Sequence, residues 1–219
     1  MSLDWDWNYA LEILPDLLRA FLRYTLVATA LGSVLAAAVG LVLAIVRYLR
    51  VPLLAQLATA FIEFVRSTPV LVQLFFLFYV LPLAGITLPA LTTGVVGLGL
   101  HYGCYYAEVY RAGIEGVPDS QWDATTALSL PTRITWQHVI LPQAVRRVLP
   151  ALGNYVISMF KETPFLALIT VPELVQQSQS IGAINFRYLE PITLAGLIFL
   201  AASYPTAIAL RKLETRLGQ

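Results

Sequence analysis

The sequence predicts an all-α integral membrane protein with five transmembrane helices, and two observations carry this prediction. Hydrophobic residues make up 58% of the 219 residues and charged residues only 12%, which is about half the charged share of an ordinary soluble domain. The few charges also leave long apolar stretches between them. This composition argues against a soluble enzyme or a disordered segment. The net charge of +1 argues against a nucleic-acid binder, which needs a basic surplus.

Three stretches without a charged side chain place most of the spans: residues 24–46, 67–107 and 191–210. A helix rises about 1.5 Å per residue, so about 20 residues cross the roughly 30 Å hydrocarbon core of a bilayer. The first and last stretches each match one span. The middle stretch is long enough for most of two spans, which are joined by a turn where Pro82, Gly85 and Pro89 interrupt it.

A further apolar region, about 144–170, contains only four charged residues and predicts the remaining span. The predicted transmembrane domain covers 22–211, with spans at about 22–47, 56–81, 88–110, 144–170 and 191–211. Residues 1–21 are expected to form a periplasmic or interfacial lead-in, because Trp5 and Trp7 suit the headgroup region. This segment lacks the basic start of a cleavable signal peptide.

The basic residues predict the orientation of the chain. Five spans place the two termini on opposite sides of the membrane. Nine of the 14 Lys and Arg residues fall on one set of alternating loops and three fall on the other. Under the positive-inside rule, the side with more basic residues is cytoplasmic. We therefore expect the N-terminus outside, the tail 212–219 in the cytoplasm, and a large cytoplasmic loop over 111–143.

The loop 111–143 is predicted to be helical. Ser120 followed by Asp123 resembles a capping box that opens a helix. A small apolar face then follows at three helically spaced positions: Ala124, Ala127 and Leu128. A second helical stretch, 132–140, is expected to end at Leu141-Pro142. By pattern alone, these helices either pack at the membrane interface or dock a soluble partner.

The same loop resembles a family motif. Residues 123–129 read Asp-Ala-Thr-Thr-Ala-Leu-Ser and are followed by Ile-Leu-Pro at 140–142, which is similar to the EAA loop of bacterial ABC importer permeases. Asp123 stands where that family has Glu, Thr125 where it has Ala, and Ser129 where it has Gly. The resemblance implies a coupling helix seated in a cleft of an ATPase subunit, with seven contact residues: Asp123, Ala124, Ala127, Leu128, Ser129, Leu141 and Pro142.

Further segments resemble the polar amino-acid branch of the same importers: 64–74 (Phe-Val-Arg-Ser-Thr-Pro-Val-Leu-Val-Gln-Leu), 149–163 and 171–174. Together the matches cover about 20–212 and imply the type I (MetI-like) permease fold. Ser67, the Lys-Glu-Thr-Pro sequence at 161–164, and residues 182–191 are similar to the permeases of ectoine and hydroxyectoine importers. The resemblance thus implies import of a polar amino acid or of such an amino-acid-like compatible solute by alternating access.

The resemblance also implies partners and a location. Such a permease pairs with a copy of itself or a sister permease in the bacterial cytoplasmic membrane. It binds two ATPase subunits inside and receives solute from an extracytoplasmic binding protein. The sequence agrees that another chain hydrolyses ATP, because neither Lys161 nor Lys212 follows a glycine as a Walker A motif requires. We expect no cofactor on this chain, with ATP and Mg²⁺ bound by the ATPase.

Four charges fall inside the predicted spans: Glu63, Arg66, Lys161 and Glu162. A charge near the bilayer centre costs about 2.5–3.5 kcal/mol, so it should be paired or face a polar cavity. One interpretation is structural pairing between helices or subunits. The other is a cavity for a zwitterion, whose carboxylate suits Arg and whose cationic nitrogen suits an acid. The resemblance favours Glu162 as the acidic contact, with further candidates at Met159, Lys161, Thr163, Glu63, Arg66 and Ser67.

Other functions receive less support. An intramembrane enzyme needs a nucleophile or metal set, and neither Gly-x-Ser-x-Gly nor His-Glu-x-x-His occurs. His101 and Cys104 are two ligands at most and predict no metal site. A subunit of an ion-coupled secondary carrier is the more serious alternative, but a carrier has no reason to keep a coupling helix. Gly99 and Gly103 form a GxxxG pair, which predicts close helix packing.

Overall fold

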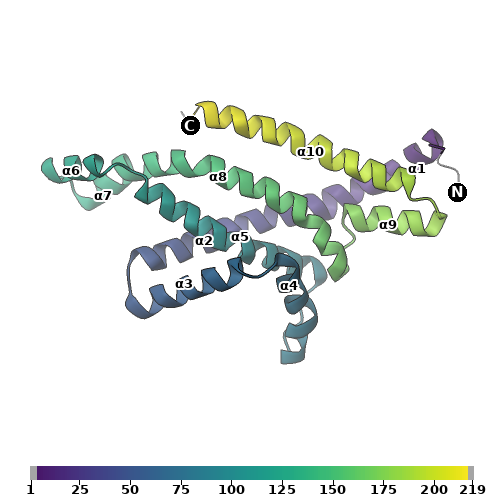
Figure 1. Cartoon of the computed structure of the whole chain (residues 1–219), viewed down its shortest axis with the longest axis horizontal. Coiled ribbons are helices and arrows are strands. Elements are labelled where there is room, and N and C mark those ends of the chain that lie inside the picture. The colour runs from purple at the N-terminus through teal and green to yellow at the C-terminus, as the bar shows by residue number, and fades with distance from the viewer. Residues whose placement is uncertain (1–3, 217–219) are drawn as a thin grey trace.

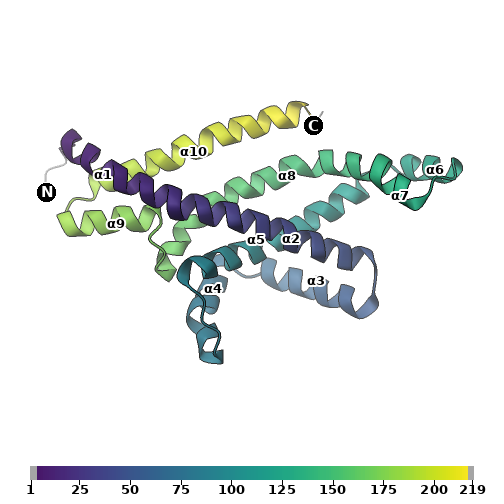
Figure 2. The same ribbon diagram turned by 180° about the vertical axis from the view of Figure 1, so that it is seen from behind.

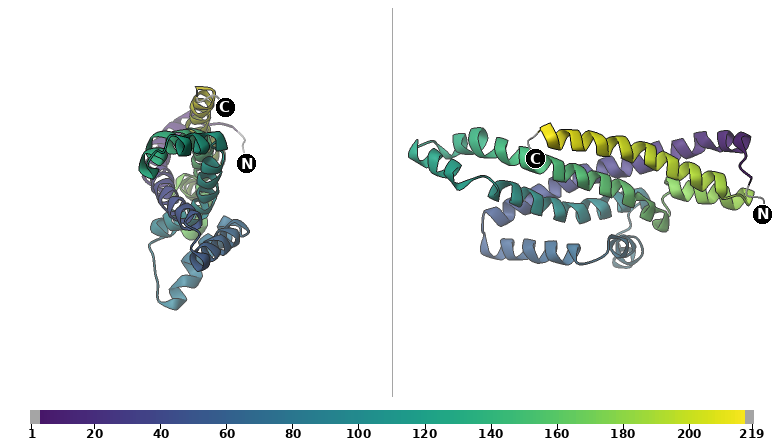
Figure 3. Two further views of the ribbon diagram at one scale, coloured as in Figure 1. Left: turned by 90° about the vertical axis from the view of Figure 1, so that its left-hand side faces the viewer. Right: turned by 45° about the horizontal axis from the view of Figure 1, so that its top comes forward.

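The computed structural model describes residues 4–216, and within that range the chain is helical with no strand. The long helices run alongside one another in an elongated bundle, with α6 and α7 at one end and α9 near the N-terminus at the other (Figure 1). One part departs from this direction: α4 projects sideways from the bundle (Figure 3). The structure has the all-α architecture that the sequence predicts.

The first long helix is continuous over Trp7–Tyr48 (Figure 2). It comprises α1 (Trp7–Ala20), the π turn η1 (Phe21–Thr25) and α2 (Leu26–Tyr48). Asp6 caps its start, because its carboxylate accepts hydrogen bonds from the N–H groups of Asn8 and Tyr9. The expected lead-in is therefore helical from Trp7 and runs directly into the first predicted span.

The second predicted span is bent into two parts. α3 (Pro52–Arg66) ends at Ser67, and α4 (Val70–Phe75) continues through η2 (Phe76–Val80) and η3 (Leu81–Ala84). The two parts meet at an angle of 104°. Pro69 is the N-cap of α4, because it has no N–H to continue a helix from α3 and its ring crowds the preceding turn. The predicted span at about 56–81 is therefore broken into two helices at Pro69.

The remaining elements are α5 (Ala90–Glu115), α6 (Asp119–Ala127), α7 (Thr132–Ile134), η4 (Thr135–Ile140), α8 (Leu141–Glu162), η5 (Thr163–Ile169), α9 (Leu174–Asn185) and α10 (Leu189–Arg216). The helix over 132–140 was expected to end at Pro142. That expectation is wrong, because α7, η4 and α8 follow without interruption. η4 is a π turn, which winds more widely than an α-helix, and it lies directly before the first turn of α8. Pro142 in that turn donates no hydrogen bond and is accommodated there without ending the helix.

Two described helices are long and apolar enough to cross a membrane, Trp7–Tyr48 and Leu189–Arg216, and the bent pair of α3 and α4 makes a third. α5 and α8 have 26 and 22 residues, which is sufficient length for a bilayer. Their hydropathy is lower because α5 carries many glycines and tyrosines and α8 carries arginines. That the chain crosses the membrane five times stays a prediction.

α2 and α5 pack closely through glycines on both helices. A Cβ on Gly40 would lie 2.5 Å from the Tyr106 Cβ and 2.9 Å from the Gly103 carbonyl oxygen. A Cβ on Gly103 would lie 2.8 Å from a methyl group of Val39. These distances are shorter than any ordinary carbon contact, so the helices approach this closely only because the side chains are missing. The close packing predicted from the GxxxG pair is confirmed at α2.

A polar tie joins the start of α1 to the start of α10. Glu190, which is fully buried, accepts hydrogen bonds from the Asp6 N–H (3.1 Å) and from the Arg187 guanidinium. Arg187 also donates to the Asp4 carbonyl oxygen and lies 5.3 Å from the centre of the Tyr9 ring. The start of α1 is therefore held against the loop between α9 and α10.

The close packing of α2 on α5 predicts a different result for each of two Gly→Ala substitutions. Gly40→Ala should destabilise the protein by about 1–3 kcal/mol, because the added methyl group overlaps backbone and side-chain atoms of α5. Gly196→Ala is the matched control, since nothing lies within 4 Å of its Cβ position, and it should be neutral or slightly stabilising. Thermal unfolding in detergent measures both. Equal unfolding temperatures for the two variants would contradict the prediction.

Candidate functional site

Three tyrosines from two helices form a cluster in the middle of the bundle. Tyr102 and Tyr105 lie on α5, and Tyr155 lies on α8. The ring centre of Tyr155 is 6.0 Å from that of Tyr102 and 5.4 Å from that of Tyr105. Tyr102 is buried, whereas Tyr105 and Tyr155 are partly exposed. This tyrosine cluster gives α5 and α8 a shared face that combines aromatic surface with hydroxyl groups.

Arg66 lies at one side of the tyrosine cluster. It is the last residue of α3, and its guanidinium carbon is 5.1 Å from the centre of the Tyr105 ring, a cation–π contact. Glu63 and Ser67 are also exposed at this end of α3. Within residues 4–216, Glu63 and Arg66 form no ion pair with each other. The two charges therefore do not pair with each other within the described chain, and their structural pairing with another subunit stays a prediction.

Glu162 lies at another side of the same cluster. It is the last residue of α8, and its carboxylate is close enough to Tyr102 to interact with the phenol. Its Oε2 atom is buried and has no hydrogen-bond partner among the described residues. Burying an unpaired carboxylate oxygen costs free energy, so such an atom calls for a donor. The tyrosine cluster thus connects an exposed guanidinium to an acceptor without a partner.

The other candidates from α8 and its end lie elsewhere. Met159 is fully buried in the core against Gly32, and its Sδ accepts a hydrogen bond from Ser33 at 3.6 Å. Thr163 is also buried and donates to the Phe160 carbonyl oxygen at 2.7 Å. Lys161 is exposed in a groove between α8, α9 and α10. The structure therefore brings Arg66 and Glu162 to one cluster and separates Lys161 from them.

Gln73 organises the bend between α3 and α4, and sequence reasoning missed it. Its Nε2 donates to the Val65 carbonyl oxygen and to the Thr68 hydroxyl, each at 2.7 Å. Its Oε1 lies 3.2 Å from Nδ1 of His101 on α5. One amide thus satisfies backbone groups freed by the break and fixes the bend to α5. The sequence offered one signal for a role of Gln73, since it is a polar amide inside the charge-free stretch 67–107.

The predicted coupling helix forms as α6. Its buried side is at Thr125, which is 5% exposed, while Ala124, Ala127 and Leu128 face outward. Asp123, Ser129, Leu141 and Pro142 are exposed as well. The small face that the sequence predicts is therefore open to a partner and not packed against the bundle.

The start and end of α6 differ from expectation. Pro118 occupies the N-cap and no side chain caps the helix, so the capping box from Ser120 to Asp123 is wrong. The reason is that Ser120 already lies in the first turn, one residue after the helix begins. At the other end, Ser129 has a φ of +49°, the left-handed conformation that glycine adopts most easily. Ser129 thus makes the turn for which the family has Gly.

Aromatic contacts attach α6 to the bundle. Trp122 of α6 packs edge-on against Trp136 of η4, with ring centres 5.4 Å apart. Trp136 in turn packs against Tyr48 at the end of α2, at 5.3 Å. Gln143 of α8 donates a hydrogen bond to Gln121 of α6 at 3.1 Å. These contacts connect α6 to both α2 and α8.

Glu173 is a second residue that sequence reasoning gave no role. It is fully buried and caps α9, since its two carboxylate oxygens accept hydrogen bonds from the N–H groups of Val175 (2.9 Å) and Gln176 (2.7 Å). Burial raises the pKa of Glu173 to about 7, because it outweighs these two hydrogen bonds, which favour the charged form. Glu173 thus titrates near neutral pH.

The geometry can be compared with known proteins. The family model for the inner membrane component of binding-protein-dependent transport systems matches residues 18–219. The chain belongs to this family. As an inner membrane component, it provides helices apolar enough to cross a membrane. The tyrosine cluster and the open face of α6 are thus features of a transport-system subunit.

Relatives of this inner membrane component cover almost the whole chain. A probable amino-acid ABC transporter permease of Sinorhizobium fredii is 43% identical over 209 residues, which are 95% of this chain and 90% of the relative. The glutamine transport system permease of Escherichia coli is 33% identical over 217 residues, which are 98% of this chain and 99% of the relative.

Solved structures agree with the fold. An amino acid ABC transporter with histidines superposes with a TM-score of 0.91 at 30% identity, covering 98% of this chain and all of that chain. A methionine ABC transporter in an inward-facing conformation has a TM-score of 0.74 at 18% identity, covering 92% and 96%. The latter likeness concerns the fold alone. The chain therefore has the MetI-like permease fold that the motifs predict.

The raised pKa of Glu173 predicts a pH-dependent stability. The folded state favours the protonated acid, so this contribution is fully present below the ordinary pKa of 4.5 and is lost as the pH rises through about 7. The loss is on the order of 3 kcal/mol. Thermal unfolding in detergent between pH 4.5 and 8 measures it. Glu173→Gln, which keeps an acceptor oxygen but cannot titrate, should flatten the profile, and an unchanged pH slope in this variant would contradict the assignment.

Proposed function

We propose that this chain is the membrane-spanning permease subunit of an ATP-driven importer of polar amino acids or amino-acid-like solutes. The observation that carries the proposal is the buried Oε2 of Glu162, which has no hydrogen-bond partner among residues 4–216. It lies at a cluster of tyrosines that Arg66 contacts from another side. Family membership supports the transport role, and relatives named as amino-acid and glutamine permeases support the solute class.

The two charged groups match the two ends of a zwitterion. A cationic nitrogen donates to the unpaired oxygen of Glu162 and relieves the cost of burying it. A carboxylate accepts two parallel hydrogen bonds from the planar guanidinium of Arg66. The tyrosine cluster between them offers ring faces and hydroxyls to the solute body. The remaining candidates, Glu63, Ser67, Met159, Lys161 and Thr163, stay predictions for the path, with Glu63 and Ser67 exposed beside Arg66.

The exposed end of α3 suggests how a second subunit takes part. Glu63, Arg66 and Ser67 are open to the surroundings in the single chain, and exposed charges at membrane depth need a polar neighbour. We propose that a second permease, identical or a sister chain, closes the path on this side. An extracytoplasmic binding protein delivers solute, and two ATPase subunits that bind ATP and Mg²⁺ dock on α6. The N-terminus lies outside and the C-terminus in the cytoplasm.

Alternating access follows from the same arrangement. When the ATPases close, they displace α6, and the contacts of Trp122 with Trp136 and of Gln121 with Gln143 carry the displacement to η4 and α8. Glu162 lies at the far end of α8. A tilt of α8 therefore changes the surroundings of Glu162 and opens the tyrosine cluster to one side of the membrane at a time.

The finer proposal for the solute is ectoine or hydroxyectoine, which rests on the resemblance at Ser67, 161–164 and 182–191. Uptake into vesicles that contain the whole transporter, with its ATPases and binding protein, tests it against Arg, His, Gln and Glu. Uptake that follows an ion gradient and ignores ATP would favour the secondary carrier instead. Uptake of Gln or Arg in preference to ectoine would keep the importer and replace the solute.

Glu162→Gln should lower transport at least tenfold, because an amide carries no charge to pair with the cationic nitrogen of the solute. The unfolding temperature should change little, since the lost oxygen makes no hydrogen bond within residues 4–216. Glu12→Gln, the same chemical change at an exposed position of α1, is the control and should transport normally. Solute uptake and ATP hydrolysis are measured in parallel. Wild-type uptake kinetics would remove Glu162 from the site.

Ala127→Trp should abolish ATP-driven uptake, because a large ring on the outward face of α6 keeps the helix out of an ATPase cleft. The substitution adds nothing to the buried side of α6, so the protein should still insert and fold. Ala127→Ser keeps the residue small and should retain most of the uptake. Co-purification of the ATPase subunits provides a second readout. Uptake at the wild-type rate by the Trp variant would refute the coupling role of α6.

A further inference from the structure

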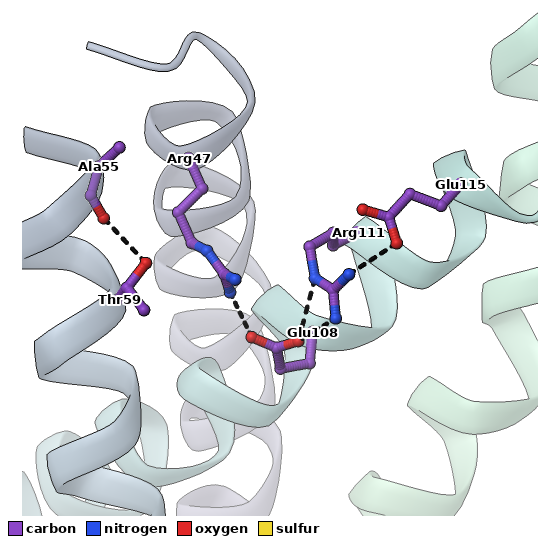
Figure 4. A network of polar contacts seen from close by, with 6 residues as sticks. All are labelled: Arg47, Ala55, Thr59, Glu108, Arg111 and Glu115. Carbon is purple, nitrogen blue, oxygen red and sulfur yellow. Dashed lines mark hydrogen bonds and ion pairs between the residues drawn. The ribbon is translucent and has the colours of Figure 1, made fainter. Parts of the chain in front are cut away.

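A network of charged side chains links the C-terminal end of α2 to the C-terminal part of α5 (Figure 4). Glu108 accepts hydrogen bonds from Arg47 of α2 and from Arg111, whose Nη2 and Nε atoms lie 2.7 and 3.1 Å from Oε2. Arg111 also donates to Glu115 at 2.6 Å. On α5 the network begins at Glu108, three residues after Tyr105 of the tyrosine cluster, and transport as proposed above makes no use of it.

A basic cavity of about 410 Å³ opens beside the network. Three arginines line it, Arg47, Arg50 and Arg111, against one acid, Glu115. Glu108 and Glu115 offset part of the charge of Arg47 and Arg111. Arg50 is exposed, and no acid among residues 4–216 forms an ion pair with it. The cavity thus presents an excess of positive charge that the described chain leaves uncompensated.

A second cavity of about 430 Å³ adjoins the basic one. The two share Ala44, Tyr48 and Ile114 as lining residues. Beyond these three, the walls of the second cavity are almost entirely apolar and include Leu41, Ile45, Val145 and Val148 from α2 and α8. A cationic site therefore continues directly into an apolar groove between spans.

We propose that the two cavities together hold one anionic phospholipid. Its phosphate headgroup lies among Arg47, Arg50 and Arg111, and an acyl chain follows the apolar cavity between α2 and α8. Basic pockets between membrane helices are suited to anionic headgroups, and each arginine near such a charge contributes about 1 kcal/mol. The apolar cavity identifies the source of the phosphate as a lipid, because free phosphate or a nucleotide has nothing to place there.

This lipid site adjoins the segment that carries α6. Trp136 lines the apolar cavity, and the same ring contacts Trp122 of α6 and Tyr48 of α2. A bound acyl chain therefore packs against the residue through which α6 is attached to the bundle. The proposal depends on placement of the chain in a membrane and not on the solute that it carries.

The test uses the assembled transporter in detergent, titrated with dioleoyl-phosphatidylglycerol or dioleoyl-phosphatidylcholine, with bound lipids counted by native mass spectrometry. We expect the wild type to retain phosphatidylglycerol in preference to phosphatidylcholine. Arg50→Gln should weaken phosphatidylglycerol retention about fivefold, the equivalent of one headgroup contact, and leave phosphatidylcholine unchanged. Val145→Trp should lower retention of both lipids, because its ring occupies the acyl-chain cavity.

Two controls make the outcome decisive. Arg133→Gln removes an exposed arginine that lines neither cavity and should retain both lipids like the wild type. Inorganic phosphate at millimolar concentration should not displace phosphatidylglycerol. Equal retention of the two lipids, or wild-type retention by Arg50→Gln, would overturn the proposal, because the arginines would then not select the headgroup. Full displacement by inorganic phosphate would likewise overturn it, in favour of a plain anion site.

Discussion

The close contact between α2 and α5 is the constraint on which the other features depend. In a bilayer, helices gain little from leaving an apolar solvent, so tight packing and polar contacts between them decide how they assemble. Gly40 and Gly103 remove the atoms that would otherwise keep the two helices apart. With one face of α5 held on α2, its polar and aromatic residues contact the other helices: His101 meets Gln73 of α4, and Tyr105 meets Arg66 of α3 and Tyr155 of α8.

Polar groups within this apolar chain divide into those that are satisfied and those that are not. Gln73 uses both ends of its amide, and Glu108 accepts from two arginines. Such groups hold the bend of α3 and α4 and the ends of α2 and α5 in place. Glu162, by contrast, keeps a buried oxygen without a donor in the described chain. Trp5, Tyr9 and Glu190 also keep one buried polar atom without a partner in the described chain, but Glu162 is the one that lies at the tyrosine cluster, where a solute can supply the missing donor.

The sequence predicts the helices well where composition alone decides, as in the charge-free stretches that became α2 and α10. The prediction of helix ends fails where the effect of a proline depends on the backbone conformation of the turn before it. Pro69 and Pro142 look alike in the sequence, yet Pro69 separates two helices and Pro142 lies in a continuous one, because a π turn precedes it. For the site, the scarcity of charge selected Glu63, Arg66, Lys161 and Glu162, and the structure brings Arg66 and Glu162 to the tyrosine cluster. Met159 packs in the core because Gly32 on another helix leaves room for it. No local sequence pattern indicates this contact. Gln73 was missed because its acceptor at Val65 is freed only by the break at Pro69, and Glu173 was missed because no helix was predicted after it, although it caps α9.

The tie between Asp6, Arg187 and Glu190 has a consequence for biosynthesis. Asp6 and Glu190 are separated by 184 positions in the chain, so the ribosome completes almost the whole protein before the first helix meets the groups that hold its start. Until then, the start of α1 has its cap but lacks the contacts of Asp6 and Asp4 with Glu190 and Arg187. A translation product that stops short of α10 therefore lacks this tie at the start of its first helix. The tie thus distinguishes complete chains from truncated ones.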